Sequence, residues 1–179
     1  MFVDVHVLQT VPPSCINRDD TGSPKTAVYG GVTRARVSSQ SWKHAVREYF
    51  SKKFPSDQSG YRTKKILDLV QEEIAKLAAD KDAEKLARTA LENAGLKLKK
   101  KKGEDEEGRD VEALFFISEA QIKALAQLAV TDEADKKKYK EALKTQPSVD
   151  MALFGRMVAS DPSLNFDACC QVAHAISTH

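Results

Sequence analysis

The sequence predicts an α+β protein in which β-structure at both ends of the chain flanks a mostly helical middle. Residues 2–9 alternate apolar and polar side chains and are rich in valine, which predicts a strand with one buried face. Between about Pro55 and Pro162 the apolar residues recur mainly at helical spacing. Residues 170–179 contain β-branched side chains with a strand-like period, so the chain is expected to return to β-structure and to end within an element.

Length and composition are those of a globular protein. With 179 residues and 41% apolar content, the chain can form one domain or one domain with an insertion. It contains no run of about 18 apolar residues, and residues 1–10 carry an acid but no basic residue, so neither a transmembrane helix nor a signal peptide is indicated. We expect a cytoplasmic location. The three cysteines, Cys169 and Cys170 adjacent, are expected to be buried thiols in a reducing compartment.

The segment after the first strand is predicted to be a basic loop. Pro12 and Pro13 end the strand, and Gly22, Pro24 and the glycine pair at 30–31 interrupt a polar and basic run. The glycine pair would let the backbone approach a ligand closely, although turns explain these glycines equally well. Tyr29 is either a ring on which an RNA base stacks or a packing residue.

A helix is predicted to follow this loop, with Ser38 or Ser39 as its cap. Apolar residues spaced i, i+3, i+4, i+7 and i+8 predict one buried stripe, made of Trp42, Ala45, Val46, Tyr49 and Phe50. The opposite face is predicted to be polar and consists of Gln40, Lys43, His44, Arg47 and Ser51. Unpaired amide groups at the helix start, together with the helix dipole, would favour an anion.

Positive charge is concentrated around this helix. Between Lys25 and Lys53 the sequence has seven basic residues and one acid, Glu48, whereas the net charge of the whole chain is +2. Such asymmetry is typical of a surface that binds an anionic polymer. An ordinary solvated helix face remains the alternative.

The middle of the chain is predicted to contain several helices. Apolar spacing indicates helices at about 61–79 and 83–94, the second ended by Gly95. Residues 96–108 change from lysines to acids and predict an exposed hairpin tip or loop. A short strand at 113–117, a helix capped by Ser118 and a charged helix at 132–144 complete the region.

The stronger catalytic and metal-binding motifs are missing from the sequence. The four histidines are scattered, and their expected role is packing or partner contact. Asp19 and Asp20 are the best candidates for catalysis, because carboxylates in an RNA groove could hold a divalent ion and activate water. They can equally be turn formers or partners of Arg18. No metal or other cofactor is expected.

Five blocks of sequence stand out along the chain. They are HVLQTVPPSCINRDD at 6–20, YGG at 29–31, RARVSSQSWKHAVR at 34–47, DMALFGRM at 150–157 and VAHAISTH at 172–179. Together they resemble the CasC-type backbone subunits of the type I-E CRISPR surveillance complex, Cascade, within the RAMP superfamily. The helical middle matches this family mainly in character and length. The family members are much longer than this chain.

The resemblance implies a palm with an RRM-like, ferredoxin-like fold, a helical fingers insertion and a thumb. Residues 1–57 would start the palm and carry the RNA-facing loop and helix, 58–167 would be the fingers, and 168–179 a truncated return strand. The implied partners are guide RNA (crRNA), target DNA through the guide, and other Cascade subunits. Copies of the full-length protein would self-associate into a filament along the RNA, and the complex would act in antiviral defence.

The resemblance also implies a set of RNA contacts and the absence of catalysis. The contacts would be Arg18, Lys25, Arg34, Arg36, Ser38, Ser39, Gln40, Lys43 and Arg47. Family members carry basic residues directly after the glycine pair, whereas this sequence has Val32 and Thr33, so no phosphate contact is expected there. Type I-E subunits are not known as nucleases, which argues against hydrolysis by Asp19 or Asp20. A metal-dependent RNA endonuclease of RAMP type is the alternative function.

Overall fold

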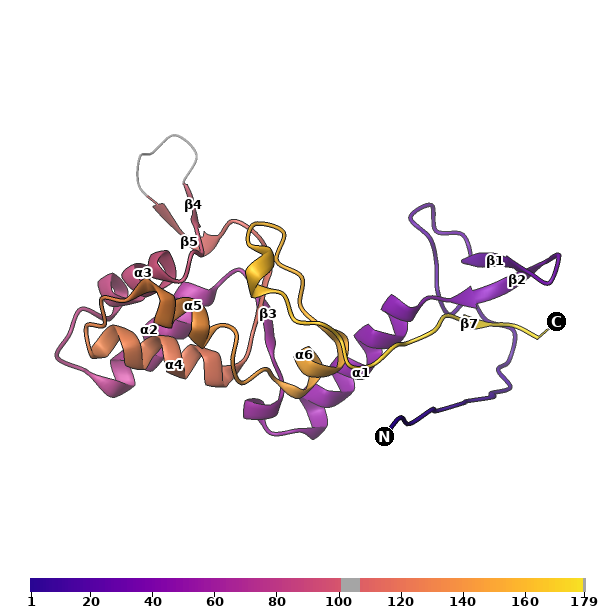
Figure 1. The fold of residues 1–179 in the computed structure, drawn as a ribbon. Helices are drawn as coiled ribbons and strands as arrows, with labels where there is room; N and C mark the ends of the chain where they lie inside the picture. Colours follow the sequence, from indigo (N-terminus) through magenta and orange to yellow (C-terminus); the bar gives the residue numbers. More distant parts are fainter. Residues whose placement is uncertain (101–106, 179) are drawn as a thin grey trace. The chain divides into compact units, whose positions relative to one another are not determined.

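The computed structural model describes residues 1–100 and 107–178, which form two compact units. One unit comprises residues 1–45 and 172–179, and the other residues 46–171. The predicted α+β class is confirmed, with six α-helices and three small antiparallel sheets in the described part of the chain (Figure 1). None of the helices in that part has the length and apolar character needed to cross a membrane. The domain boundaries at 57 and 167 stay a prediction.

The unit of residues 1–45 and 172–179 contains a three-stranded sheet. Strands β1 (Thr26–Tyr29) and β2 (Val32–Val37) form a hairpin, and β7 (Ala175–Ile176) pairs with β2 on its other side. The turn consists of Gly30 and Gly31, whose φ angles are 64° and 78°. Two successive positive φ angles match the right-handed twist of a hairpin, and glycine adopts them without strain.

Two sequence expectations for this unit are wrong. Residues 2–9 form no strand and lie exposed, because no segment in the described part of the chain pairs with them. The region around the glycine pair is a hairpin instead of a loop. Strand-forming residues lie on both sides of that pair, so a hairpin could have been recognised from the sequence.

The helix expected after the hairpin is α1 (Ser39–Lys53), capped by Ser38. Its predicted buried stripe is wrong, because no residue of α1 is buried and the side chains of Trp42 and Tyr49 are 39% and 59% exposed. The apolar spacing identified the helix correctly but not the face that packs. In the unit of residues 46–171, α1 packs through Phe50, the last member of that stripe, and through Arg47, which was expected on the polar face.

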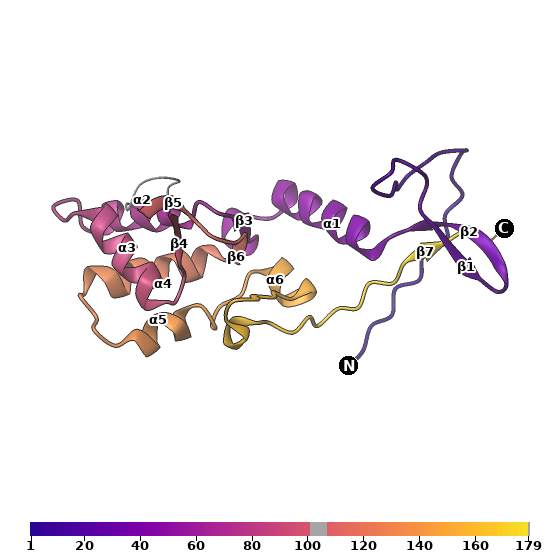
Figure 2. The ribbon, with the colours of Figure 1, turned by 90° about the horizontal axis from the view of Figure 1, so that it is seen from above.

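Three helices build the core of the unit of residues 46–171. These are α2 (Ile66–Leu77), α3 (Ala83–Asn93) and α4 (Glu119–Val130), which lie side by side in both ribbon views (Figures 1 and 2). Helix α2 turns Ile66, Val70 and Ile74 inward at intervals of four residues, and all three are fully buried. The predicted cap of α4 by Ser118 is confirmed, since Ser118 Oγ accepts from the amide of Gln121. The Gln121 side chain accepts in turn from the amide of Ser118, which completes a capping box.

Shorter elements surround this core. Strands β3 (Tyr61–Thr63) and β6 (Phe115–Ile117) pair, as do β4 (Leu98–Lys100) and β5 (Glu107–Val111). Short helices α5 (Lys136–Ala142) and α6 (Val149–Phe154) follow, with single 3-10 turns at Ser56–Gln58 and Pro162–Leu164.

Two helices of this unit start later than the sequence predicts. The helix expected from residue 61 starts at Ile66, because Tyr61–Thr63 pairs with β6. The helix expected from residue 132 starts after Asp135, which caps it. The strands β4 and β5 flank the expected loop at 96–108, but its tip at 101–106 lies outside the described residues. The short strand expected at 113–117 is confirmed at Phe115–Ile117.

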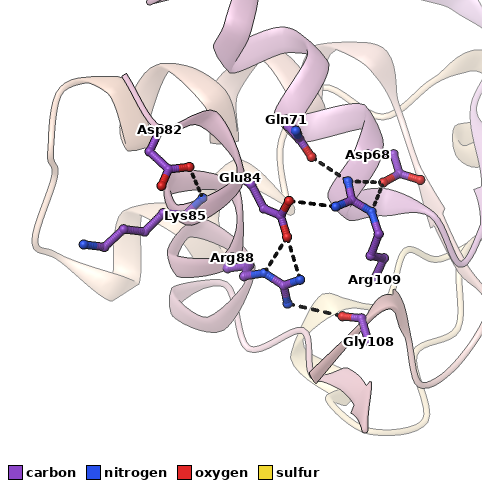
Figure 3. A network of polar contacts seen from close by, with 8 residues as sticks. All are labelled: Asp68, Gln71, Asp82, Glu84, Lys85, Arg88, Gly108 and Arg109. Atoms are coloured by element: carbon purple, nitrogen blue, oxygen red, sulfur yellow. Dashed lines mark hydrogen bonds and ion pairs between the residues drawn. The ribbon is translucent and has the colours of Figure 1, made fainter. Parts of the chain in front are cut away.

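Hydrogen bonds from the Arg109 side chain connect the β4–β5 hairpin to helices α2 and α3. Its guanidinium donates to Asp68 and Gln71 of α2 and to Glu84 of α3, at distances of 2.6–3.0 Å. Glu84 also accepts hydrogen bonds from Nε and Nη2 of Arg88, and Arg88 Nη1 donates to the carbonyl of Gly108 (Figure 3). The hydrogen bonds from Arg88 and Arg109 lower the pKa of Glu84.

The cysteines do not match the expectation of buried thiols. All three are free, but Cys169 is exposed and Cys15 and Cys170 are only half-buried. Cys169 and Cys170 lie in an irregular segment, and their backbone amides donate to the carbonyls of Ala152 and Leu153. Backbone pairing holds this segment, so the adjacent thiols need no place in the core.

Candidate nucleic-acid interface

The start of α1 is held by side chains from three parts of the chain. Asn17 Oδ1 accepts from the amide of Ser38 at 3.0 Å, and His174 Nδ1 accepts from the amide of Ser39 at 2.9 Å. Ser38 Oγ accepts from the amide of Ser41 at 3.2 Å. The expectation that these amides are unpaired and available to a phosphate is therefore wrong. The helix dipole and the nearby side chains remain as the features that would favour an anion.

The turn at residues 18–24 is organised by Asp19. Its Oδ1 accepts from the amides of Thr21 and Ser23 and from the Thr21 hydroxyl, at distances of 2.7–2.9 Å. The hydrogen bond from the Thr21 side chain is the main cause that lowers the pKa of Asp19. Asp19 is therefore a turn former, as the simpler interpretation of the sequence had it.

Arg18 supports the same turn. Its Nη1 donates to the carbonyl of Gly22 at 2.7 Å, and Arg18 and Pro24 form an isolated β-bridge. The amide of Lys25 donates to the carbonyl of Asn17, which brings Lys25 next to the residue that caps Ser38. The turn thus carries two basic side chains to the start of α1.

The two arginines of β2 differ in their surroundings. Arg34 donates from Nε to the carbonyl of Tyr29 and from Nη1 to that of Ser177, both at 3.1 Å. It ties the hairpin to the chain after β7. Arg36 is half-buried, and its Nε has no hydrogen-bond partner in the described chain. A guanidinium with five N–H groups retains donors for a ligand in both cases.

Lys43 and Gln40 follow on the first two turns of α1. Gln40 is exposed and Lys43 half-buried. Among the described residues no carboxylate forms an ion pair with Lys43 or Lys25. Their charges are thus available to a phosphate. Tyr29 lies at the hairpin turn with 65% of its surface exposed, so the alternative that it is a packing residue is not supported.

Arg47 does not lie on a solvated face as expected. In the unit of residues 46–171 its guanidinium carbon lies 5.0 Å from the ring centre of Phe154 and 5.8 Å from that of Phe116. Its Nε is buried without a hydrogen-bond partner in the described chain. Burial first, and the nearby charge of Arg62 second, lower the pKa of Arg47, while Asp150 opposes them.

The structure shows contacts of three residues that the sequence does not identify as part of this region. Asn17 has a residue type that commonly caps helices, but its distance of 21 residues from Ser38 hides the role. His174 had been assigned to packing or partner contact, and nothing in the local pattern relates it to Ser39. Arg62 lies where apolar spacing predicts a helix, whereas the structure has strand β3 there.

The chain matches the family model described as "CT1975-like protein" over residues 3–179. The chain belongs to the CT1975-like family. No curated protein matches it. Among solved structures, a chain of a "CRISPR RNA-guided surveillance complex" is 36% identical, with a TM-score of 0.64 over 96% of this chain and 56% of its own length.

A second solved structure gives a similar result. It is a chain of a "CRISPR RNA-guided surveillance complex, pre-nicking", 35% identical, with a TM-score of 0.57 over 93% of this chain and 49% of its own length. The chain therefore spans about half the length of these relatives. The predicted resemblance to a subunit of a CRISPR surveillance complex is confirmed.

Proposed function

We propose that this CT1975-like chain is part of a guide-RNA-binding backbone subunit of a type I-E CRISPR surveillance complex. The observation that carries the proposal is the likeness over 96% of the chain to a subunit of an RNA-guided complex. In such a complex the bases of the guide pair with target DNA, so the protein must hold the sugar-phosphate backbone without reading its sequence.

The surroundings of α1 support this role. Residues 25–53 carry seven basic side chains against one acid, and Lys25 and Lys43 have no ion-pair partner among the described residues. The proposed RNA contacts remain the nine assigned from the resemblance. They are Arg18, Lys25, Arg34, Arg36, Ser38, Ser39, Gln40, Lys43 and Arg47.

The role implies partners beyond the guide. These are target DNA paired with the guide, other subunits of the complex, and further copies of the full-length protein arranged along the RNA. We place the complex in the cytoplasm of a prokaryotic cell, where guide RNA and invading DNA meet.

Salt dependence of RNA binding tests the proposal. If about four cations neutralise phosphates, the slope of log affinity against log salt is on the order of −3 for single-stranded RNA. Lys43→Ala should make this slope shallower by about 0.7 and weaken binding equally for RNAs of unrelated sequence. Fluorescence anisotropy with two labelled RNAs measures both quantities.

Lys85 on α3 is the matched control, since it is an exposed lysine of a helix in the same chain. Lys85→Ala should leave the slope unchanged. Equal slopes for the two variants, or an affinity that does not respond to salt, would overturn the assignment of Lys43. A strong preference for one RNA sequence would contradict backbone recognition.

We also propose that the subunit is not a nuclease. The hydrogen bonds of Asp19 support this, because its Oδ1 already accepts three hydrogen bonds within its own turn. The alternative, a metal-dependent RNA endonuclease that uses Asp19 or Asp20, predicts cleavage of labelled target RNA with magnesium or manganese. Cleavage that is lost in Asp20→Asn would favour the enzyme.

A further inference from the structure

Two arginines in the unit of residues 46–171 lie against one aromatic ring. Arg62 in β3 is directly opposite Phe116 in β6, and its guanidinium carbon lies 6.0 Å from the ring centre. Arg47 approaches the same ring at 5.8 Å from α1. Three elements therefore meet at Phe116, and two of them contribute a positive charge.

The backbone around Gly60 fixes the position of the ring. A Cβ atom on Gly60 would lie 2.3 Å from Phe116 Cε2, so any side chain there would displace the ring. The amide of Gly60 donates to Asp150 Oδ1 at 3.0 Å, and Asp150 is itself 4% exposed. The ring is thus held in place beside the two guanidinium groups, and 6% of its own surface is exposed. We call this ring, with the two guanidinium groups against it, the Phe116 platform.

The charges at this platform are not balanced. In the described chain no carboxylate forms an ion pair with Arg47 or Arg62. Asp150 is near enough to raise the pKa of Arg47, yet burial and the charge of Arg62 outweigh it. Two like charges held close together cost free energy, and an anion bound beside them would relieve that cost.

Polar atoms without partners accompany the two arginines. Arg47 Nε and Ser148 Oγ are both buried and have no hydrogen-bond partner in the described chain. Ser148 is 2% exposed, and its Oγ would lie 2.6 Å from a Cβ on Gly60, the position that Phe116 Cε2 also crowds. Donors that find no acceptor within the protein point to an acceptor supplied by a ligand.

We propose that Arg62 is a further RNA-binding residue and that Arg47 and Arg62 on the Phe116 platform bind phosphodiester groups of the guide. Guanidinium groups present forked N–H donors that suit phosphate oxygens, and the ring keeps both side chains in place. This inference rests on the proposed function. It extends that function because Arg62 belongs to no motif from which RNA contacts were assigned.

The test compares Arg62→Gln, Arg62→Lys and Lys85→Gln in the purified protein, with single-stranded oligouridylate as the probe. Arg62→Gln should weaken binding about fivefold at moderate salt and make the log-log salt slope shallower by about 0.7. Arg62→Lys keeps the charge and should keep the slope. Lys85→Gln should match the unchanged protein. Melting temperatures check that every variant folds.

Chemical modification of the unchanged protein provides a second test, independent of the variants. Arg62 is exposed, so phenylglyoxal should modify it, and bound oligouridylate should protect it. An unchanged slope in Arg62→Gln, or no protection of Arg62, overturns the inference. An effect that appears with oligothymidylate DNA but not with RNA overturns the assignment to the guide.

The failures of the two proposals can be told apart. If Lys43→Ala makes the slope shallower while Arg62→Gln does not, the proposed function stands and this inference falls. If the unchanged protein does not bind oligouridylate, both fall.

Discussion

His174 and Ser39 share a hydrogen bond across 135 residues of sequence, with the amide of Ser39 donating to His174 Nδ1 at 2.9 Å. The imidazole accepts at Nδ1 and therefore carries its proton on Nε2. The β2–β7 pairing lies directly beside this bond, so the chain after residue 172 is held both to β2 and to the start of α1.

His174→Ala should loosen the first turn of α1. Loss of the acceptor should raise the exchange rate of the Ser39 amide about fivefold, which corresponds to about 1 kcal/mol, a typical value for a helix cap. Hydrogen exchange followed by NMR measures this rate. His6→Ala, in the exposed segment at the N-terminus, is the control and should leave Ser39 unchanged. An unchanged rate in His174→Ala would show that the bond contributes nothing.

Arg156 should be the most sensitive position in the unit of residues 46–171. It is 4% exposed, and its guanidinium carbon lies 4.9 Å and 4.8 Å from the ring centres of Phe115 and Phe166. The guanidinium donates to the carbonyls of Phe116, Leu143 and Leu164. Burial lowers its pKa to about 10, so it still carries its charge at neutral pH. Arg156→Ala removes the Arg156 donors to the carbonyls of Phe116 and Leu164, although Leu143 still accepts from Gln121 Nε2, and should cost about 3–5 kcal/mol in urea unfolding.

Lys123 supplies the comparison for Arg156. Its ion pair with Glu119 on α4 is a surface pair, and Lys123→Ala should cost less than about 0.5 kcal/mol. A urea midpoint for Arg156→Ala equal to that of Lys123→Ala would contradict the role given to Arg156.

Asp161 should make stability depend on acid pH. The hydrogen bond from Lys140 at 2.8 Å, followed by that from Ser163, lowers the pKa of Asp161 from 3.8 to about 2. A lowered pKa in the folded state contributes stability that is present above 3.8 and lost as the pH falls through about 2. Lys140 is 44% exposed, so solvent limits the effect to about 1 kcal/mol or less.

Asp161→Asn isolates this contribution, because an asparagine keeps an acceptor for the amide of Ser163 and loses the charge. Other carboxylates also titrate in acid, so the quantity to measure is the difference in melting temperature between the two proteins. That difference should shrink as the pH is lowered from about 4 to about 2. A constant difference would count against the ion pair.

Arg109 should control the attachment of the β4–β5 hairpin. Arg109→Lys keeps a charge but cannot reach Asp68, Gln71 and Glu84 together, so the amides of Asp110 and Val111 should exchange faster (Figure 3). Lys76→Arg at the exposed end of α2 is the control. Non-additive effects in Arg109→Lys combined with Glu84→Gln would confirm that the two residues act together. Strict additivity would exclude such coupling.

Local patterns predicted the helices well and their packing less well. The capping box at Ser118, the cap of Ser38 and the stop at Gly95 depend on neighbours within a few residues, so they could be recognised in the sequence. The packing face of α1 could not. An amphipathic pattern says that two faces differ, whereas the elements that meet Arg47 come from residues 116 and 154.

The sequence by itself determined the α+β class, the family and the concentration of positive charge around α1, because composition and short motifs carry this information. Tertiary structure alone decided that His174 and Asn17 occupy the first amides of α1, that Asp19 serves its own turn, and that Arg62 joins Arg47 at Phe116. Each of the contacts made by His174, Asn17 and Arg62 joins residues that are distant in the chain. Such pairings follow from how the elements pack, and no local spacing encodes them.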